Sequence, residues 1–582
     1  MNLAVRFSNP RHARHVIARA ITCSMLLVLP SCGIPKLRPA LPGPTLTANY
    51  KAGDNGAGSL ENSALVPIED FFHDPFLTRL ICQALAGNQD LRIMFEDVQI
   101  ARNEILGRSG AYLPSVGLGL AAGVEKFSRF TPLGAAEEEL TYLPGKRFPA
   151  VPPNFLIAAD FNWQVDIWRQ LRNARDAAVQ RFLATNEGRN FAITRLVAEI
   201  AENYYMLLAL DARLQNLDSI IALQQRSLEM ARAKMKFARG TELGVQRFIA
   251  EVNGNQSQKL IVRQEIIEVE NRINFLVGRY PQPVERMSGE DFFNLNLHAL
   301  SVGVPAQLLQ YRPDIRRAER ELASSGLEVK VARAQFFPRL DISGPPGPTG
   351  PYGPIGFQAF NPRYLFWGYQ SILLNVAGDL TTPLINKRAI KADYKNANAR
   401  QLQSVYNYQR VILNAFTEVV NRVFRVQNYS QSIEIKRQQV QALERSVNIA
   451  NQLFQRAFVP GEERGSRPVD YMDVLFAQRD LFDARMILIE TKQQQLTAIV
   501  NVYQALGGGL LGCGHADPKL PQPGPDLAPS QQGGSDRSGT EQLPAPRKLP
   551  EQPPIPGKEP DQPSVPKPAQ PDRLPEPGKL PM

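Results

Sequence analysis

Cysteine is scarce in this chain: four of the 582 residues are cysteines, at Cys23, Cys32, Cys82 and Cys513. No two of them have the close spacing that zinc ligands need. If Cys23 is removed with an N-terminal signal, Cys82 and Cys513 can form one pair at most. The cysteines therefore indicate neither a zinc site nor the disulfide framework of a small secreted domain.

Histidine is nearly as scarce, with five residues. His12 and His15 belong to the N-terminal segment, which leaves His73, His298 and His515 far apart in the sequence. The sequence contains no metal-ligand spacing, phosphate-binding loop or nucleophile motif. These absences argue against an enzyme, and the sequence predicts neither a metal site nor a cofactor.

A long apolar run is also missing. No stretch of about 20 consecutive apolar residues occurs, so the sequence predicts no membrane-spanning helix. If the chain crosses a bilayer, it must do so with strands. The formal net charge of +10 includes four arginines of the N-terminal segment, and 10 − 4 leaves +6. This charge gives no support for binding to nucleic acid.

The N-terminal segment has the features of an export signal. Its four arginines, with no acidic residue, lie before and at the edge of an apolar run from Ala20 to Leu29 that is too short to span a bilayer. The sequence L-P-S-C at residues 29–32 resembles the lipobox at which bacterial lipoproteins are cut and acylated. We predict a signal peptide at residues 1–31 and lipidation of Cys32. The alternative is an ordinary signal peptide, although no Ala-x-Ala pattern is evident nearby.

Long helices dominate the middle of the chain. Residues 171–238 contain no proline, and their apolar residues recur three and four positions apart. A helix of this length would reach about 100 Å. A second stretch of this kind covers residues 390–458. Each should fold back on a return helix, giving antiparallel hairpins at residues 171–280 and 388–505.

The two hairpins match each other in sequence. R-S-L-E-M-A at residues 226–231 aligns with R-S-V-N-I-A at residues 445–450, and the same offset of 219 positions pairs Glu199 with Glu418. We therefore predict an internal duplication. The expected organisation is a Pro- and Gly-rich leader at 32–67, repeats at 68–300 and 301–515, and a disordered Pro-rich tail at 516–582.

Four short stretches interrupt the helical pattern with an alternation of period two, which is typical of strands with one apolar and one polar face. Within residues 155–167, for example, apolar odd positions alternate with Asp160, Asn162 and Gln164. All tryptophans of the chain lie in or beside these strands, as expected for aromatic residues at a membrane interface. The strands are expected near residues 115–130, 154–168, 339–344 and 366–381, and the tryptophans are Trp163, Trp168 and Trp367.

Four strands cannot close a transmembrane barrel, which needs about eight, and an open sheet edge is not tolerated in lipid. We therefore expect several copies of the chain to share one barrel. The collagen-like stretch G-P-P-G-P-T-G-P-Y-G-P-I-G at residues 344–356 lies between the third and fourth strands. It is too short for a stable triple helix, and we expect an exposed loop at the far end of the barrel.

Several motifs, in one order from about residue 68 to 510, resemble those of a known family. They are F-F-H-D-P-F-L at 71–77, A-Y-L-P-S at 111–115, V-P-A-Q-L-L-Q-Y-R-P-D-I-R-R-A-E at 304–319, A-Q-F-F-P at 334–338 and Y-Q-A-L-G-G-G at 503–509. The family is that of TolC-like outer-membrane efflux lipoproteins, the NodT-type components of resistance-nodulation-division pumps.

The resemblance implies a mainly α-helical fold with a β-barrel. Three copies would supply four strands each to a twelve-stranded barrel, and their hairpins would build a tunnel across the periplasm. It implies a lipid-anchored outer-membrane protein with a periplasmic helical domain, working with a periplasmic adaptor protein and an inner-membrane pump. Such a homotrimer is a passive conduit for small molecules, drugs or metal ions, and needs no cofactor.

Two other functions remain as alternatives. One is the outer-membrane exit duct of a type I protein secretion system, which would share the architecture. The other is a coiled-coil lipoprotein that acts as an envelope scaffold, which leaves the four amphipathic strands unexplained.

The ends of the hairpins are the expected contact and gating sites. Tip residues would face the adaptor, and two aspartates would narrow the tunnel, because each acidic position forms a ring of three like charges in a trimer. The alternative is that these are solvated loop charges. The predicted adaptor contacts are Gly240, Thr241, Glu242, Glu462, Glu463 and Arg464, and the predicted constriction residues are Asp470 and Asp473.

The chain also departs from what the resemblance implies. Where the family has glycine after its second strand, this chain has Arg169, and residues 383–388 lack the usual glycine pair. Leu243 and Gln246 replace the polar pattern of the first tip. We interpret R-P-D at residues 312–314 as structural, because proline suits the first turn of a helix and the helix dipole favours a carboxylate there.

Overall fold

The computed structural model describes residues 34–46, 50, 62–124, 126–237, 240–288, 291–295, 297, 301, 303–343, 354–366, 368–374, 377–381, 387–456 and 471–509. The chain divides into two compact units, residues 1–516 and 517–582, and all described residues belong to the first. The predicted lipidation site Cys32 and the predicted tail at 516–582 lie outside the described residues.

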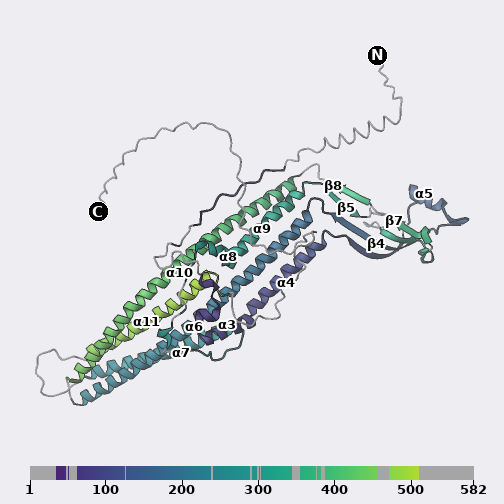
Figure 1. Cartoon of the computed structure of the whole chain (residues 1–582). Helices are drawn as coiled ribbons and strands as arrows, with labels where there is room; N and C mark the ends of the chain where they lie inside the picture. Colours follow the sequence, from purple (N-terminus) through teal and green to yellow (C-terminus); the bar gives the residue numbers. More distant parts are fainter. Residues whose placement is uncertain are drawn as a thin grey trace, which may run out of the picture. The chain divides into compact units, whose positions relative to one another are not determined.

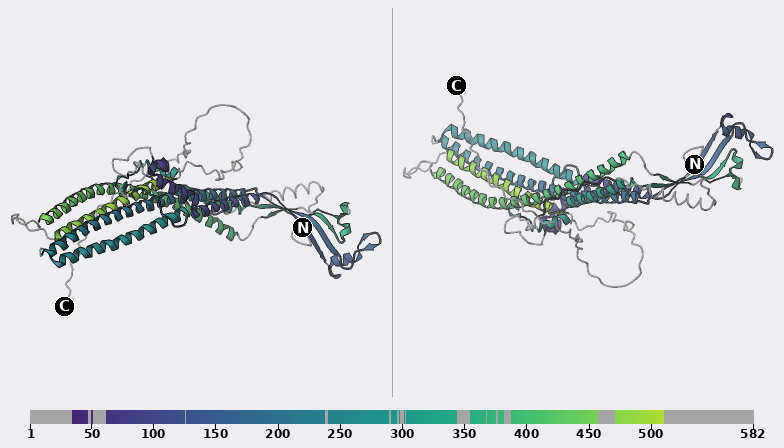
Figure 2. Two further views of the ribbon diagram at one scale, coloured as in Figure 1. Left: turned by 90° about the horizontal axis from the view of Figure 1, so that it is seen from below. Right: turned by 90° about the horizontal axis from the view of Figure 1, so that it is seen from above.

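One pattern of elements occurs twice in the first unit: a helix, a group of strands, and a long helical hairpin (Figure 1). This order confirms the predicted hairpins and internal duplication. The six helices concerned are α4 (Gln89–Gly110), α6 (Gln170–Lys236) and α7 (Glu242–Val277) in the first repeat, and α9 (Pro313–Ala334), α10 (Arg388–Arg456) and α11 (Tyr471–Ala505) in the second. Figure 2 shows the long helices side by side, with the strands at one end of them.

Shorter helices connect these elements. None of the described helices is long and apolar enough to cross a bilayer. The short helices are η1 (Ser63–Leu65), α2 (Ile68–Phe72), α3 (Pro75–Gly87), α5 (Pro132–Glu139), η2 (Asp291–Asn294), η3 (Pro305–Gln307), α8 (Leu308–Tyr311), η4 (Pro362–Tyr364) and η5 (Gly368–Ser371).

The six strands of the main sheet are antiparallel and occupy four positions side by side. Two of these positions are each filled by two strands placed end to end. In order these four are β1 (Ser115–Val124); β4 (Pro153–Val165); β5 (Arg339–Ser343) with β6 (Pro354–Ala359); and β8 (Ala377–Thr381) with β7 (Ile372–Leu374). The small hairpin of β2 (Thr141–Leu143) and β3 (Lys146–Arg147) is separate from this sheet.

Most of the collagen-like stretch, residues 344–353, lies outside the described residues. On its two sides, Ser343 at the end of β5 pairs with Asn162, and Pro354 at the start of β6 pairs with Asp160 on the same strand. The last three residues of the expected loop therefore belong to a strand. For them the prediction of a loop was wrong, because they are paired with β4.

The strand register divides the sheet into an apolar and a polar face. Leu118 pairs with Ala159 and Ile355 pairs with the same residue from the other side, so these three share a face. Asp160, the next residue along β4, lies on the opposite face. Asp341 of β5 lies on that polar face too, because its partner on β4 is two residues away from Asn162 and so points the same way. Because direct partners point the same way and neighbours alternate, the apolar set stays together across all four strands.

Aromatic residues form the core where the helices of both repeats meet. The ring of Tyr503 in α11 stacks on Phe71 of α2, with centroids 4.0 Å apart, and its hydroxyl donates to the Val66 carbonyl at 2.9 Å. On α6, the buried Tyr204 hydroxyl donates to Asp74, the residue that caps α3, at 2.7 Å. Buried tyrosine hydroxyls need such partners. The motif at residues 71–77 thus packs the short helices α2 and α3 against the long helices of both repeats.

The backbone has an unfavourable conformation at the start of α6. Arg169 has a φ of 56°, in the left-handed region, at the position where the resemblance implies glycine. The conformation is held by Asp166, whose carboxylate accepts from the backbone N–H groups of Leu171 and Arg172, each at 3.0 Å. The Arg172 side chain also donates to this carboxylate at 3.1 Å. The aspartate therefore satisfies the first turn of the helix and offsets the strain.

Substituting this residue tests that explanation. Arg169→Gly should leave stability unchanged or raise it by up to about 1 kcal/mol, because glycine adopts positive φ without penalty. Arg169→Val should lose about 1–3 kcal/mol. The control is Arg175→Gly, at ordinary helical dihedrals in the same helix, which should lose about 0.5–1 kcal/mol. Denaturant unfolding measures all three, and equal losses for the two glycine variants would contradict the account.

Candidate functional site

The tip of the first hairpin is a tight turn built by its own residues. The hydroxyl of Thr241 accepts from the Gly244 N–H at 3.3 Å and so caps α7. The next residue, Glu242, accepts a hydrogen bond from the Gln246 side chain at 2.7 Å. Gly240 leaves little room for a side chain, since a Cβ there would lie 3.1 Å from the Met235 nitrogen. Thr241 and Glu242 are exposed, so the turn presents polar groups on a rigid base.

The start of α11 lies against this tip. A Cβ on Gly244 would meet the ring of Tyr471 at 3.3 Å, which places the first turns of α7 and α11 in contact. Asp473 lies in the same first turn of α11 and is exposed. The structure thus brings this predicted constriction residue close to the predicted adaptor contacts of the first tip. Glu462, Glu463, Arg464 and Asp470 lie outside the described residues.

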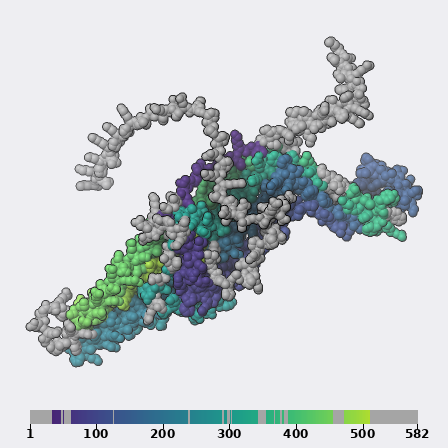
Figure 3. Space-filling view, in the orientation of Figure 1, coloured from purple at the N-terminus to yellow at the C-terminus, as the bar shows by residue number. Residues whose placement is uncertain are grey.

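Contacts between the two repeats hold the described ends of the hairpins together. Lys234 near the end of α6 donates to the Phe454 carbonyl at 2.8 Å, and its ammonium lies 3.2 Å from the centroid of the Phe454 ring. Beside it, Phe248 and Val245 of α7 are buried with Leu475 of α11. We did not predict Lys234, because its partner lies 220 positions away in the sequence. Figure 3 shows the described ends of α6 and α7, in blue to teal, and those of α10 and α11, in green to yellow, at the same end of the described surface.

A buried polar layer crosses the helices above the tips. The Gln478 amide of α11 donates to the Ser227 hydroxyl of α6 at 3.0 Å, and Gln478 is fully buried. One turn earlier in α6, Gln224 accepts from Asn255 of α7 at 2.8 Å. Partnered polar groups inside a helical bundle fix the register of the helices. The layer thus fixes α6 against both of its neighbours.

A buried ionic network lies at the opposite end of the second hairpin. The guanidinium of Arg312 is 4 % exposed and bonds to Asp314 at 2.7 and 2.9 Å, to Glu418 of α10 at 2.9 Å and to the Ala505 carbonyl of α11 at 2.8 Å. Although burial opposes the charged form, the hydrogen bonds and charges of the two carboxylates raise the pKa of Arg312. Arg422 pairs with the same glutamate. One arginine therefore joins α9, α10 and the end of α11.

The first repeat carries a related pairing. Glu199, which aligns with Glu418 in the duplication, pairs with Arg272 of the return helix α7. Arg286, after that helix, pairs with Asp211 and Glu270. Both repeats thus fix their long helix to a neighbouring segment through arginine, which fits the structural interpretation of residues 312–314.

The described tryptophans lie where the sheet meets the helices. The indole of Trp163 donates to the Tyr112 carbonyl at 3.1 Å, and that of Trp168 donates to the Pro338 carbonyl at 2.7 Å. The Trp168 ring also stacks on Phe337, with centroids 4.8 Å apart. Trp367 lies outside the described residues.

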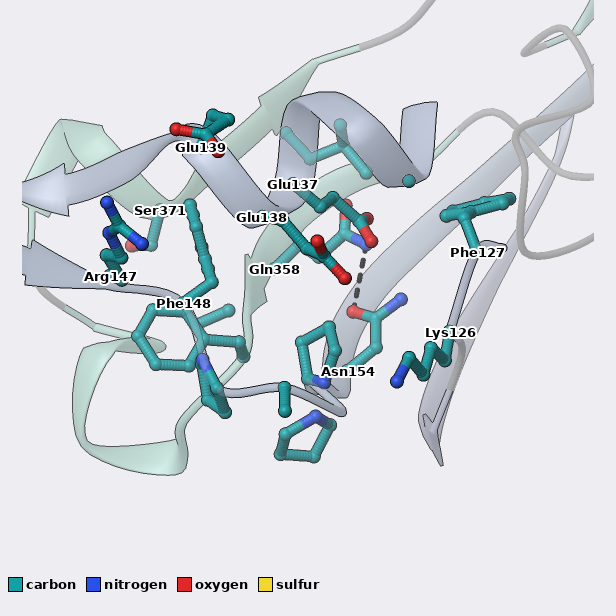
Figure 4. Close-up of a pocket in the computed structure, with 18 of the residues that line it drawn as sticks. Lys126, Phe127, Glu137, Glu138, Glu139, Arg147, Phe148, Asn154, Gln358 and Ser371 are labelled. Carbon is teal, nitrogen blue, oxygen red and sulfur yellow. Dashed lines mark hydrogen bonds between the residues drawn. The ribbon is translucent and has the colours of Figure 1, made fainter. Parts of the chain in front are cut away.

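A cavity of about 820 Å³ lies at the sheet end that is remote from the helices (Figure 4). Lysine and arginine from the segment after β1 line it together with Glu137 and Glu138 of α5, and Arg129 pairs with Glu138 at 3.0 Å. Gln358 donates to Asn154 at 2.9 Å across its floor. The mixed charge favours neither anions nor cations. Among the described residues, no group of three or more His, Cys, Asp and Glu could hold a metal ion.

Two long segments of the chain match a known protein family. The family of outer membrane efflux proteins matches residues 80–279 and 304–508. The chain belongs to the outer membrane efflux protein family. The two matched segments correspond to the two repeats, and the resemblance and the predicted mainly helical, duplicated fold are confirmed.

Relatives of this efflux protein cover most of its length. The solvent efflux pump outer membrane protein SrpC of Pseudomonas putida is 26% identical over 496 residues, which are 83% of this chain and 97% of the relative. The cation efflux system protein CusC of Escherichia coli K12 is 25% identical over 477 residues, 81% of this chain and 94% of the relative. A solved structure of CusC has a TM-score of 0.67 at 23% identity, covering 81% of this chain and 99% of that chain.

Membership of the family decides between the alternatives. The efflux protein functions in the outer membrane, with its helical domain in the periplasm, as predicted. Its relatives are efflux components, which does not favour a protein-secretion duct or an envelope scaffold.

Removing the buried arginine tests its structural role. Arg312→Met should destabilise the efflux protein by about 3–5 kcal/mol, because the half-buried Asp314 carboxylate and the Ala505 carbonyl lose their side-chain partner, and Glu418 keeps only Arg422. The control is Arg317→Met, whose exposed pair with Glu321 should contribute less than about 0.5 kcal/mol. Guanidinium unfolding followed by the helical circular dichroism signal measures both. Equal effects of the two substitutions would show that the junction is not a structural anchor.

Proposed function

We propose that three copies of the chain close a twelve-stranded barrel in the outer membrane, continued by a helical tunnel across the periplasm. The observation that carries this proposal is the pairing of the sheet. Among the described residues, β1 pairs only with β4, while β7 and β8 pair only with β6 and β5, so the sheet has two unpaired edges. A backbone edge left unpaired in hydrocarbon costs several kcal/mol per group. Pairing the edge of one copy with the opposite edge of the next satisfies all of them.

The two faces of the sheet support the same arrangement. Val116, Leu118 and Leu120 on β1 are 70, 79 and 74% exposed in the single chain, as expected for a lipid-facing surface. The opposite face carries Asp160, Asp341 and other polar residues, which suits a water-filled interior. Trp163 and Trp168, at the helical end of the strands, would mark the periplasmic interface, with Trp367 as a third interface residue.

The leader supports lipidation of Cys32. It follows α10, with the Arg38 N–H donating to Asn398 at 3.0 Å and Ile34 packed beside Tyr394, near the start of the helix. Cys32 precedes Ile34 by two residues and therefore lies within about 7 Å of it along the chain. A lipid there would enter the membrane beside the sheet. Lipid labelling that persists in Cys32→Ser would exclude this site.

The tips are proposed to dock the periplasmic adaptor, through which the channel joins an inner-membrane pump. The first tip offers a rigid polar turn that fits such a contact. The second tip is assigned the same role from its sequence, and the adjoining aspartates are assigned to the constriction. The proposed adaptor contacts are Gly240, Thr241, Glu242, Glu462, Glu463 and Arg464, and the proposed constriction residues are Asp470 and Asp473.

The pump, and not this channel, is proposed to choose the substrate. The name of one relative mentions solvents and that of the other mentions cations, and the two have nearly the same sequence identity to this chain. A passive conduit fits both kinds of small molecule. Its role requires no cofactor and no covalent chemistry.

Conductance of the purified protein in planar bilayers tests the proposed function. The wild type should form channels, and replacing Asp470 and Asp473 by asparagine should lower the preference for cations, because each position contributes a ring of three charges. The control is Asp218→Asn, an exposed position within α6 that is paired with Lys259 and remote in sequence from both hairpin tips, which should leave selectivity unchanged. Unchanged selectivity in the double variant would contradict the constriction assignment, and no conductance in the wild type would contradict the channel.

A further inference from the structure

The connection between β1 and β4 is much longer than a hairpin needs. Val124 and Pro153 pair at the end of these two strands, and a connection of about two to five residues can join such a pair. The chain instead uses residues 125–152, which include α5 and the β2–β3 hairpin. We propose that this connection builds a binding site for an uncharged saccharide in the cavity of about 820 Å³ at the sheet end that is remote from the helices.

Close packing fixes α5 as one wall of the cavity. Thr131 caps this helix by accepting from the Gly134 N–H at 3.3 Å. Gly134 is buried, and a Cβ there would lie 2.2 Å from the Ser128 carbonyl oxygen, so the absence of a side chain lets the helix approach the preceding segment. Arg129 adds an ion pair with Glu138 at 3.0 Å. These contacts hold the acidic side of α5 in one position.

Aromatic rings form a second wall. Phe148 and Phe360 line the cavity, with ring centroids 5.3 Å apart and an interplanar angle of 70°. Tyr142 packs against both, with centroids 5.5 and 4.8 Å away, and Tyr364 packs against Phe360 at 5.5 Å. Rings held in this way offer an apolar surface that loses little conformational entropy when a ligand binds.

Two amides form the floor. Gln358 pairs with Leu156, and Asn154 lies two residues before Leu156, so the side chains of Asn154 and Gln358 share a face of the sheet. Gln358 donates to Asn154 at 2.9 Å, which leaves the Asn154 amino group as a donor and the Gln358 oxygen as an acceptor. By the same alternation, Asp160 lies on this face. The site rests on the proposed function for its surroundings, since this polar face would line the channel and place the cavity at its outer mouth.

The charges around the cavity balance. Of the described residues that line it, Arg129 and Glu138 are the only two that pair with each other. The half-buried Glu137 has no partner among the described residues, and Figure 4 shows the side chains of Glu137 and Glu138 reaching from α5 toward Asn154. The basic residues of the lining are Lys126, Arg129 and Arg147, and the acidic residues are Glu137, Glu138 and Glu139.

This combination fits the chemistry of a saccharide. Each sugar hydroxyl can donate to a carboxylate and accept from an amide or a basic side chain, while the C–H face of the sugar ring packs on Phe148. An apolar ligand would leave the polar groups without partners, and an ion would be repelled by the charges of its own sign. A small zwitterion could pair with both signs but would leave the aromatic wall uncovered. The volume lies within the range of about 300–1,000 Å³ for small-molecule sites.

Binding to the purified full-length protein tests the proposal. The protein is kept in lauryldimethylamine oxide, because a detergent with a sugar head group would compete, and is applied to arrays of neutral oligosaccharides, anionic oligosaccharides and lipopolysaccharide from the same cells. We expect saturable binding of at least one neutral oligosaccharide. Lipopolysaccharide binding that this oligosaccharide displaces would support the site and identify a lipid-attached glycan as a source of the ligand. No binding of any neutral saccharide, or binding of anionic saccharides alone, would overturn the proposal.

Two substitutions connect binding to the cavity. Glu137→Gln should weaken binding about tenfold or more, as expected for the loss of hydrogen bonds to a charged group. Phe148→Leu keeps an apolar contact but removes the ring face, and should weaken binding about threefold to tenfold. The matched controls are Glu96→Gln, exposed on α4, and Phe130→Leu, 98% exposed in the same connection and outside the cavity lining. Both controls should bind as the wild type does, and equal effects of a substitution and its control would contradict the site.

Channel conductance of the same preparations separates this site from the proposed function. A wild type that conducts but binds no neutral saccharide would refute the site and leave the channel intact. Saccharide binding without conductance would refute the channel and keep the site. A variant that conducts like the wild type is folded, so a loss of binding in that variant reports on the cavity itself.

Discussion

Backbone hydrogen bonding at the edges of the sheet is the constraint on which the account of this protein depends. In lipid, each strand edge must find a partner, and a single chain of the described sheet has two edges that lack one. A closed assembly of several copies removes both edges at once. The proposed assembly would place the apolar face toward lipid, which would account for the large side chains on β1 that are exposed in one copy.

The long helices must keep a fixed register relative to one another for the assembly to stay closed along their length. Apolar contacts alone allow long helices to slide, whereas buried polar partners fix them at one position. Ser227 with Gln478 and Arg312 with Glu418 hold the helices at two separate levels. Beside the first tip, the absence of a side chain at Gly244 leaves room for the ring of Tyr471, so the first turns of α7 and α11 pack closely together.

Features that depend on local periodicity were predictable from the sequence. The helix expected at residues 171–238 is found at Gln170–Lys236, because a proline-free stretch with period 3.6 leaves little other choice. The pairing of both β5 and β6 with β4 was not predictable, since it depends on register between strands far apart in the sequence. The partners of Arg312 and Lys234 were missed for the same reason: the Ala505 and Phe454 carbonyls lie 193 and 220 positions away. Arg169 stood out as a departure, but only the structure shows its positive φ and the role of Asp166.

The number of chains in the assembly is the most direct test of the account. Native mass spectrometry of the protein, extracted from outer membranes in a mild detergent, measures this number without assumptions about shape. The account predicts one dominant species with three times the mass of the mature, lipidated chain, which dissociates to single chains when the sheet is unfolded by heat. A folded species with the mass of one chain would contradict it, because such a chain would have to keep two unpaired strand edges in the membrane.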